Sequence, residues 1–543
     1  MAKFVLFLIL GGILWSGVRP ARAQEILIER FLETPVQGDF VLQPAKVELS
    51  LHPGEQAERT LYVTNRLGVP ARFSLEVADI TGSTDPYEGA RLSGSDEVAQ
   101  YFNFEAKEFT LVHGERARIP VTIRVPSSAS PGEISGAVLV SGASPERIAG
   151  SAQITSRAGA LFFVRVEGGA QEGLLRSFSL NRRVATMVFE NTGVSHLNPY
   201  GMIEVRNIFS KTTKVIPIDP WFVLPGSTRA RSIALGDDRG WGRFSAKLSL
   251  NRGYADIIDT KVVVFWMLPS WQWIGGLFIL VLLGAAGFYR PYRKSMKKFI
   301  FLIAALLLST VLGQRAIAEI ASSTNYKIQF DSINIGGLIS TSTTYQTNDT
   351  VGDAATGTST SSTYEIRAGY RHMNESYIAI SSPANVAMSP AIVSNGGTGE
   401  GSAAWTVTTD NIGGYILTVA ASTDPALTAS SDSFANYSPA GSVPDFTWHV
   451  SASASEFGFT PSGSHITDTY KDNGSSCATG SSDTANACWA AVTTSNTTIA
   501  RSFSANQPSG TATTVKFRAE AGSARNQSAA SYSATITATA LAQ

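Results

Sequence analysis

The chain has 543 residues, of which 16% are charged and 43% hydrophobic, with 48 glycines and 23 prolines. That length suits about three or four domains, and a turn-rich composition with many β-branched residues is typical of β modules. The formal net charge is zero, but residues 319–543 hold 8 basic and 16 acidic side chains, so the rest is basic. No basic groove with interleaved aromatic residues accompanies this excess, which argues against a nucleic-acid partner.

The first 23 residues have the layout of a secretory signal peptide. Lys3 precedes an apolar run over residues 4–15, and small residues stand at positions 21 and 23. This pattern predicts export and cleavage between Ala23 and Gln24. We therefore expect the chain to belong to a bacterial envelope.

Residues 24–168 are expected to form a first β-sandwich. Apolar and polar residues alternate over residues 47–51, 61–63 and 121–125, between turns rich in proline and glycine. Short strands at roughly ten-residue spacing are typical of an antiparallel sandwich. The turns at residues 52–55 and 113–116 each precede a strand, and we expect both to be hairpin tips.

Two runs in this region carry a family resemblance. PGEQAERTLYVTNRLGVPARFSLEVADI and FTLVHGERARIPVTIRVPSSASPGEISGAVLVSG resemble the immunoglobulin-like, peptidoglycan-binding domain of WxL-interacting proteins, over about residues 40–167. Residues 174–268 supply further strands and turns, like the second domain that precedes the membrane anchor in that family. The resemblance implies tandem immunoglobulin-like sandwiches, an adhesive role at the cell wall and no catalysis.

A membrane-spanning helix is expected over residues 271–289. This stretch, WQWIGGLFILVLLGAAGFY, has no charged residue, and residues 290–298 after it are strongly basic. Nineteen apolar residues are long enough to cross a bilayer, and the basic loop places that end in the cytoplasm. Residues 24–268 then lie outside the membrane.

Residues 299–318 repeat the layout of a signal peptide inside the chain. Met296 and two lysines precede the apolar run FIFLIAALLLSTVL, and small residues precede a possible cleavage site between Ala318 and Glu319. Two interpretations remain open. Either a membrane hairpin returns the chain to the outside, or two adjacent export genes are read as one chain, with Met296 as an alternative start. Both interpretations predict a protein of the cell membrane whose residues 319–543 lie outside the cytoplasm.

Residues 319–543 are rich in Ser, Thr, Ala and Gly and are expected to form a C-terminal β-sandwich. Strands are predicted near residues 326–330, 364–367, 404–407, 415–419, 446–450 and 532–539. Cys477 and Cys488, the only cysteines, are expected to form a disulfide in an oxidising compartment, which would stabilise the fold by about 3 kcal/mol. The region is weakly similar to secreted WxL-type wall proteins and to uncharacterised secreted proteins of candidate-phylum bacteria, but it lacks the Trp-x-Leu signature.

No pattern of catalysis or cofactor binding is found in the sequence. The six histidines form no HExxH motif, and no GxSxG elbow is present. Oxygen ligands near the cysteines (Asp468, Asp472, Asn473 and Asp483) match no calcium loop, so a solvated loop is favoured. A polar cluster of Glu190, Asn191, Gly193, His196 and Asn198 is interpreted as turn chemistry. We predict neither a metal nor a cofactor, and no enzyme.

The leading hypothesis is a membrane-anchored surface protein that binds peptidoglycan or a partner surface protein through sheet edges and loops. The alternative is a chaperone-like assembly factor that lends a sheet edge to exported proteins, with the C-terminal module as one possible client. A carbohydrate-active enzyme would need paired carboxylates across a cleft, and no pair stands out.

Overall fold

The computed structural model describes residues 26–31, 34–104, 106–143, 151–181, 183–207, 212–236, 242–267, 376–393, 396–441 and 443–543, and four short strands between 339 and 368. Within these ranges no helix is long and apolar enough to span a bilayer. Both predicted signal segments (1–23 and 299–318), the predicted membrane helix (271–289) and the basic loop (290–298) lie outside the described residues, as do their proposed cleavage sites.

The first sandwich is built from eleven strands, and in several of them side chains alternate between core and solvent. In β9, for example, every second residue from Ala117 to Ile123 is buried, as expected when one face of a strand packs on a core. The strands are β1 (Leu27–Arg30), β2 (Asp39–Gln43), β3 (Lys46–Leu51), β4 (Gln56–Arg66), β5 (Ala71–Thr81), β6 (Arg91–Leu92), β7 (Phe102–Asn103), β8 (Glu108–Leu111), β9 (Glu115–Arg124), β10 (Gly132–Ala143) and β11 (Ser151–Val166), with a 3-10 turn at Glu97–Tyr101.

The second sandwich has one sheet of three strands and one of four, with its own core around Phe189, Trp221 and Leu248. Its strands are β12 (Gly173–Asn181), β13 (Val184–Asn191), β14 (Tyr200–Asn207), β15 (Thr212–Ile218), β16 (Thr228–Ala234), β17 (Gly242–Asn251) and β18 (Ile258–Met267). The all-β class and the sandwich form of this region are confirmed.

The C-terminal module, residues 376–543, is also made of strands. They are β23 (Ile378–Ser381), β24 (Val386–Ala387), β25 (Gly397–Thr409), β26 (Tyr415–Ala421), β27 (Leu427–Thr428), β28 (Ser433–Asn436), β29 (Ser455–Ser462), β30 (Ala490–Ala491), β31 (Thr497–Ser502), β32 (Thr511–Ala521) and β33 (Ala534–Ala542). Before it, β19 (Ile339–Thr341) pairs with β20 (Gln346–Asn348), and β21 (Gly357–Thr360) with β22 (Glu365–Ala368). The module contains the predicted disulfide between Cys477 and Cys488.

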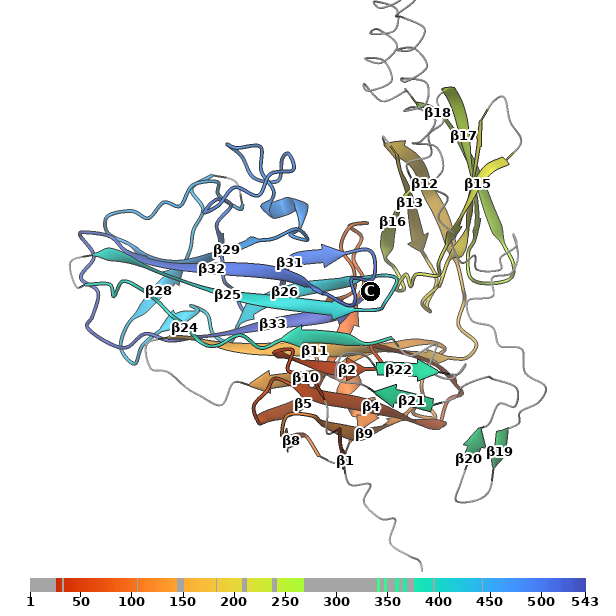
Figure 1. Cartoon of the computed structure of the whole chain (residues 1–543), viewed down its shortest axis with the longest axis horizontal. Coiled ribbons are helices and arrows are strands. Elements are labelled where there is room, and N and C mark those ends of the chain that lie inside the picture. Colours follow the sequence, from red (N-terminus) through yellow and green to blue (C-terminus); the bar gives the residue numbers. More distant parts are fainter. Residues whose placement is uncertain are drawn as a thin grey trace, which may run out of the picture.

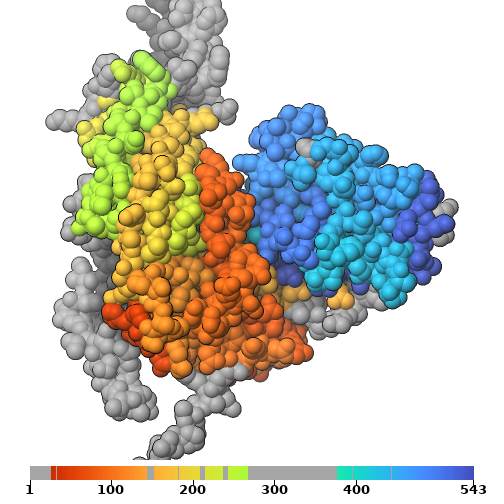
Figure 2. Space-filling view, turned by 180° about the vertical axis from the view of Figure 1, so that it is seen from behind, coloured from red at the N-terminus to blue at the C-terminus, as the bar shows by residue number. Residues whose placement is uncertain are grey.

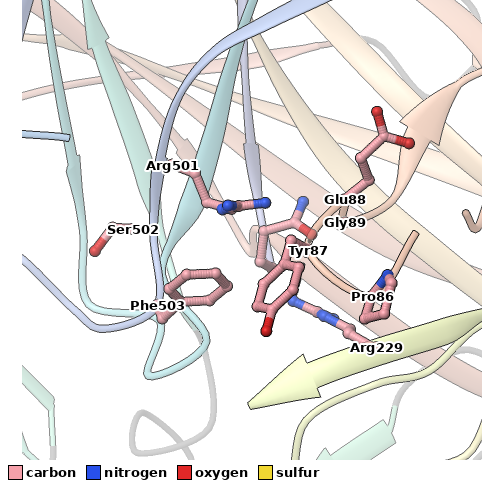
Figure 3. A pocket seen from close by; sticks show the side chains of 9 residues that line it. Pro86, Tyr87, Glu88, Gly89, Arg229, Arg501, Ser502 and Phe503 are labelled. Atoms are coloured by element: carbon pink, nitrogen blue, oxygen red, sulfur yellow. Dashed lines mark hydrogen bonds between the residues drawn. The ribbon is translucent and has the colours of Figure 1, made fainter. Parts of the chain in front are cut away.

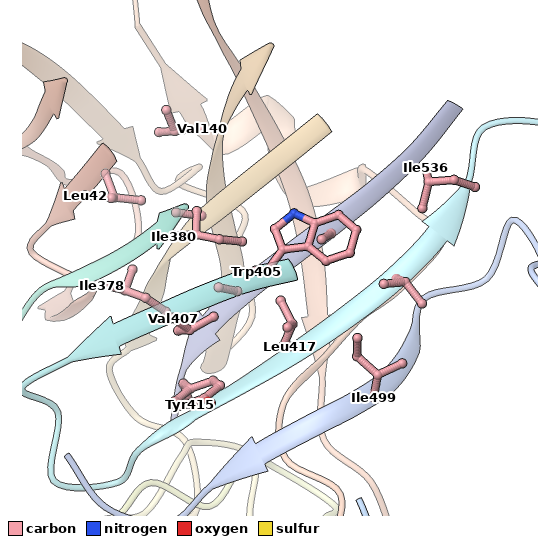
Figure 4. Packing of buried hydrophobic residues seen from close by; sticks show 14 of the residues in the cluster. Leu42, Val140, Ile378, Ile380, Trp405, Val407, Tyr415, Leu417, Ile499 and Ile536 are labelled. Atoms are coloured by element: carbon pink, nitrogen blue, oxygen red, sulfur yellow. The ribbon is translucent and has the colours of Figure 1, made fainter. Parts of the chain in front are cut away.

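The first sandwich and the C-terminal module share both of their sheets (Figure 1). One sheet runs β1-β9-β4-β2-β23-β25-β32-β29-β28-β27, and the other runs β31-β26-β33-β11-β10-β5-β6. A single buried apolar cluster extends through both parts and includes Leu42, Ile380, Trp405 and Ile536 (Figure 4). The module was expected to be a sandwich of its own, whereas it forms one continuous double layer with the first sandwich.

Three local predictions differ from the structure. The turns at residues 52–55 and 113–116 are not hairpin tips, because β3 and β8 belong to one layer while β4 and β9 belong to the other. Each turn therefore carries the chain across the core. Residues 446–450 form no strand; instead Trp448 stacks on Tyr437, with ring centroids 4.1 Å apart. An irregular segment that packs through aromatic side chains has the same aromatic-rich composition as a strand, so composition alone does not separate the two.

Candidate assembly interface

Strand β11 is the element that joins the first sandwich to the C-terminal module. Along one edge, Ala152 to Gly159 pair in parallel with β33, and Leu161 to Val166 then pair with β3. Along the other edge β11 pairs with β10, and at Ser151 and Ala152 with β24. Residues 152–159 of β11 thus pair with the module's β33 on one edge, while the other edge pairs with β24 only at residues 151 and 152 and with β10 from residue 155 onward. The remainder of β11 belongs to the first sandwich.

The inner face of β11 fills the module's core with small and medium side chains. Ala152, Ile154, Ser156 and Ala158 are all buried there. The indole Nε1–H of Trp405 donates a 3.0 Å hydrogen bond to the hydroxyl of Ser156, and that hydroxyl donates in turn to the carbonyl of residue 381 at 2.8 Å. A tryptophan that is fully buried needs such a partner for its one donor. The Ser156 hydroxyl therefore matches this strand to this module.

The outer face of β11 is equally close to β33. A Cβ at Gly159 would lie 2.3 Å from Cδ2 of Leu541, so any larger residue there would force the buried Leu541 side chain to shift. Two residues earlier, Arg157 Nε donates a 2.9 Å hydrogen bond to the hydroxyl of Thr539. Leu541 belongs to a smaller buried cluster with Phe163 of the first sandwich and Phe222 of the second. All three parts of the molecule meet at this point.

A second pair of strands closes the opposite layer of the joint. β2 pairs antiparallel with β23, placing Phe40 opposite Ile380 and Leu42 opposite Ile378. All four of these side chains are buried. Because β2 and β11 lie in different layers, the first sandwich contacts the module through both of its sheets.

The second sandwich also contacts the module, through arginine side chains. Arg231 donates hydrogen bonds of 3.2 and 3.1 Å to the carbonyls of Phe503 and Ile412. Arg229 donates to the carbonyl of Phe222 at 2.6 Å and to Oε1 of Gln543 at 3.4 Å. Burial, with the nearby charges of Arg231 and Arg501, lowers the pKa of Arg229 to about 9. These long polar side chains bridge the two parts without sheet pairing.

A small pocket marks this three-way contact (Figure 3). Tyr87 and Glu88 of the first sandwich, Arg229 of the second, and Arg501 and Phe503 of the module line it. Its volume of about 10 Å³ is close to the minimum for one water molecule. Figure 2 shows the first sandwich in contact with both other parts on the face turned to the viewer. The pocket is a packing seam too small for a metabolite.

The joint between the two N-terminal sandwiches combines the apolar contact of Phe163 with Phe222 and a polar group centred on His196. Its buried ring contacts the Glu133 carboxylate through Nδ1 and lies 3.5 Å from the Glu48 carboxylate through Nε2. Burial alone would lower the pKa of His196, but the two carboxylates outweigh it and raise the pKa. Asn198 donates a 3.1 Å hydrogen bond to Glu48. Lys46, 2.7 Å from Glu48, completes the charged group.

The polar cluster predicted as turn chemistry is divided by the structure. Asn191 fits the prediction, since its side-chain oxygen accepts a 2.9 Å hydrogen bond from the amide of Gly193. His196 and Asn198 instead bind carboxylates of the first sandwich. Their partners, Glu48 and Glu133, are far away in the sequence, so no local signal singled them out.

In the oxygen-rich loop beside the disulfide, the side-chain oxygens of Asp472 bind backbone amides of the loop itself. The carboxylate of Asp472 accepts hydrogen bonds from the amides of Gly474 and Thr484 at 2.7 and 2.9 Å. The Thr484 amide is the main cause of the lowered pKa of Asp472. Over the described ranges, no group of three or more histidine, cysteine, aspartate or glutamate side chains has a geometry that could hold a metal.

No protein-family model and no curated protein matches the chain. Solved structures give weak matches that include the class 5 fimbriae chaperone CfaA (12% identity, TM-score 0.25, 42% of this chain and 100% of that one). The YadV chaperone matches with 13% identity and a TM-score of 0.24, over 41% of this chain and 100% of that one. A chain of the CsuC–CsuE chaperone–tip adhesion subunit complex of Acinetobacter baumannii matches with 11% identity and a TM-score of 0.23, over 41% of this chain and 97% of that one. At such scores these similarities carry no argument about function.

Proposed function

We propose that residues 24–268 act as a chaperone-like assembly unit that completes the C-terminal module by lending it strand β11. The observation that supports this most directly is the parallel pairing of eight residues of β11 with β33 of the module, next to a two-residue pairing with β24. This arrangement is the strand addition by which many proteins bind an extended segment of a partner. Of the two hypotheses from the sequence, sheet-edge donation accounts for this contact.

The energetic reason lies in what the module lacks without β11. Eight residues of β33, from Ala534 to Leu541, pair with β11, and their backbone groups would otherwise form an open sheet edge. The buried side chains of Ile154 and Trp405 would also be exposed to water, with a loss of about 1.5–3 kcal/mol for a side chain of this kind. An isolated module is therefore expected to be unstable and prone to aggregate.

The contact has the same form whether the two parts are one chain or two. Residues 268 and 376 bracket the predicted membrane hairpin or gene junction, and the strands that meet lie on either side of it. Strand donation thus suits both a tethered client and a separately exported one. Within a single chain, the tether would raise the effective concentration of the module at the β11 edge.

The test is to export residues 24–268 and 319–543 as two separate chains and to measure their association by copurification. We expect a stable complex, and an Ile154→Asp variant should lose it, because a carboxylate would be buried against the module's core. Gln153→Asp is the matched control, since Gln153 is half-buried on the opposite face of the same strand. A module that is soluble alone and ignores residues 24–268 would overturn the proposal.

Binding to peptidoglycan or to another surface protein stays a prediction. A pull-down of residues 24–268 with purified sacculi checks it directly. Recovery of the protein wholly in the supernatant would count against the wall-binding part of the original hypothesis, and would leave strand donation untouched.

A further inference from the structure

The outer face of β18 is an apolar surface that no described element covers. Val262, Val264 and Trp266 are 59%, 50% and 70% exposed and point to the same side of the strand. The residues between them point inward, and Phe265 stacks on Phe244 of the core at 5.8 Å. A soluble sheet normally carries polar residues on its solvated face, so three consecutive apolar positions there call for a partner.

Basic side chains flank this apolar stripe. In the sheet register Lys247 lies opposite Val262 and Arg243 lies opposite Trp266, and opposed residues of antiparallel strands share a face. The next strand adds Arg206, which pairs with Glu204 at 2.7 Å. The face therefore combines valine, tryptophan and a net positive charge.

The stripe also lies on the path to the predicted membrane segment. Arg252, just before β18, donates a 2.6 Å hydrogen bond to the carbonyl of Gly173, near the linker from the first sandwich. β18 then runs away from the first sandwich to Met267, as an edge strand of the four-stranded sheet (Figure 1). The uncharged apolar run begins at residue 271, so Trp266 is only five residues from it.

We propose that this face of β18 lies on the lipid headgroups of the membrane, with a preference for anionic lipids. Tryptophan is enriched at the membrane–water interface, and each lysine or arginine near an anionic surface adds about 1 kcal/mol of attraction. A second copy of the chain is a poorer occupant, since two faces of net positive charge would repel each other. Docking would fix the orientation of the second sandwich on the bilayer, independently of strand donation.

The experiment uses the full chain in lipid nanodiscs, with a polarity-sensitive fluorophore on a Val264→Cys variant. Cys477 and Cys488 are paired in the disulfide, so the label has a single thiol to react with. Val69→Cys is the control, because Val69 is 52% exposed in the first sandwich, far along the chain from the anchor. Unchanged melting temperatures would show that both labelled proteins are folded.

We expect a lipid-borne nitroxide quencher to reduce the fluorescence at position 264 several-fold more than at position 69. The difference should be larger with anionic than with zwitterionic lipid, and should shrink as salt is added. Equal quenching at both positions would overturn the proposal. The fluorescence could instead change with the number of protein copies per disc while the lipid quencher has no effect. That result would assign the face to a second copy and would also overturn the proposal.

Discussion

The first sandwich has two joints, and they are built from different chemistry. Towards the C-terminal module it shares two sheets and an apolar core, with Ile154, Trp405 and Ile380 buried along the seam. Towards the second sandwich it uses the smaller contact of Phe163 with Phe222 and a buried histidine between two carboxylates. Apolar burial scales with area and depends little on pH, whereas a charged cluster depends on protonation. The first joint should decide whether the module folds, and the stability of the second joint should depend on pH.

The largest expected effect is at the shared core. Trp405→Ala removes a fully buried indole and its hydrogen bond to Ser156, which should destabilise the joint by about 3–5 kcal/mol. Amide hydrogen exchange in the full chain should show β4 and β32 losing protection together, because one core serves both. Thr406→Ala, at a half-buried neighbouring position, should change little. Loss of protection confined to β32 would mean that the two parts have separate cores.

A smaller effect is expected from the close approach of β11 and β33. Gly159→Ala would place a Cβ 2.3 Å from the Leu541 side chain, and such overpacking typically costs about 1–3 kcal/mol. Adding Leu541→Ala should recover part of that loss, measured by urea unfolding as a double-mutant cycle. Gly441→Ala is the control, since nothing lies within 4 Å of its Cβ. Strictly additive losses would show that the two residues do not meet.

The smallest effect is expected at the histidine joint and follows pH. Because the pKa of His196 is raised above 6.5 in the folded protein, its stabilising contribution is complete below pH 6.5 and is lost as the pH rises through the raised value. His196 and Lys46 overcome burial and lower the pKa of Glu48 below 4.5. Its contribution is therefore complete above pH 4.5 and is lost as the pH falls through the lowered value.

Melting curves of the full chain recorded from pH 6.5 upward check the histidine part of this pH dependence. The melting temperature should fall on the alkaline side in the native protein, and a His196→Gln variant should lack that fall. Val194→Gln, close in sequence and 44% exposed, controls for a general loss of stability. An alkaline loss of equal size in His196→Gln would place the titrating group elsewhere.

Several features of the candidate interface followed from the sequence. The alternation in β9 predicted which of its side chains are buried, because side chains on a strand point to opposite faces in turn. The pairing of Cys477 with Cys488 followed from there being only two cysteines in an exported chain.

Only the tertiary structure decided which strand lends its edge, and to which neighbour. Residues 152–159 read as an ordinary half-buried strand, and their parallel pairing with residues 534–541 joins segments nearly 400 positions apart. Every residue offers the same backbone hydrogen-bonding groups, so the backbone of a strand does not determine which strand it pairs with. What selects the partner is the fit of side chains across the seam, Gly159 against Leu541 and Ser156 against Trp405, and that fit exists only once both sheets have formed.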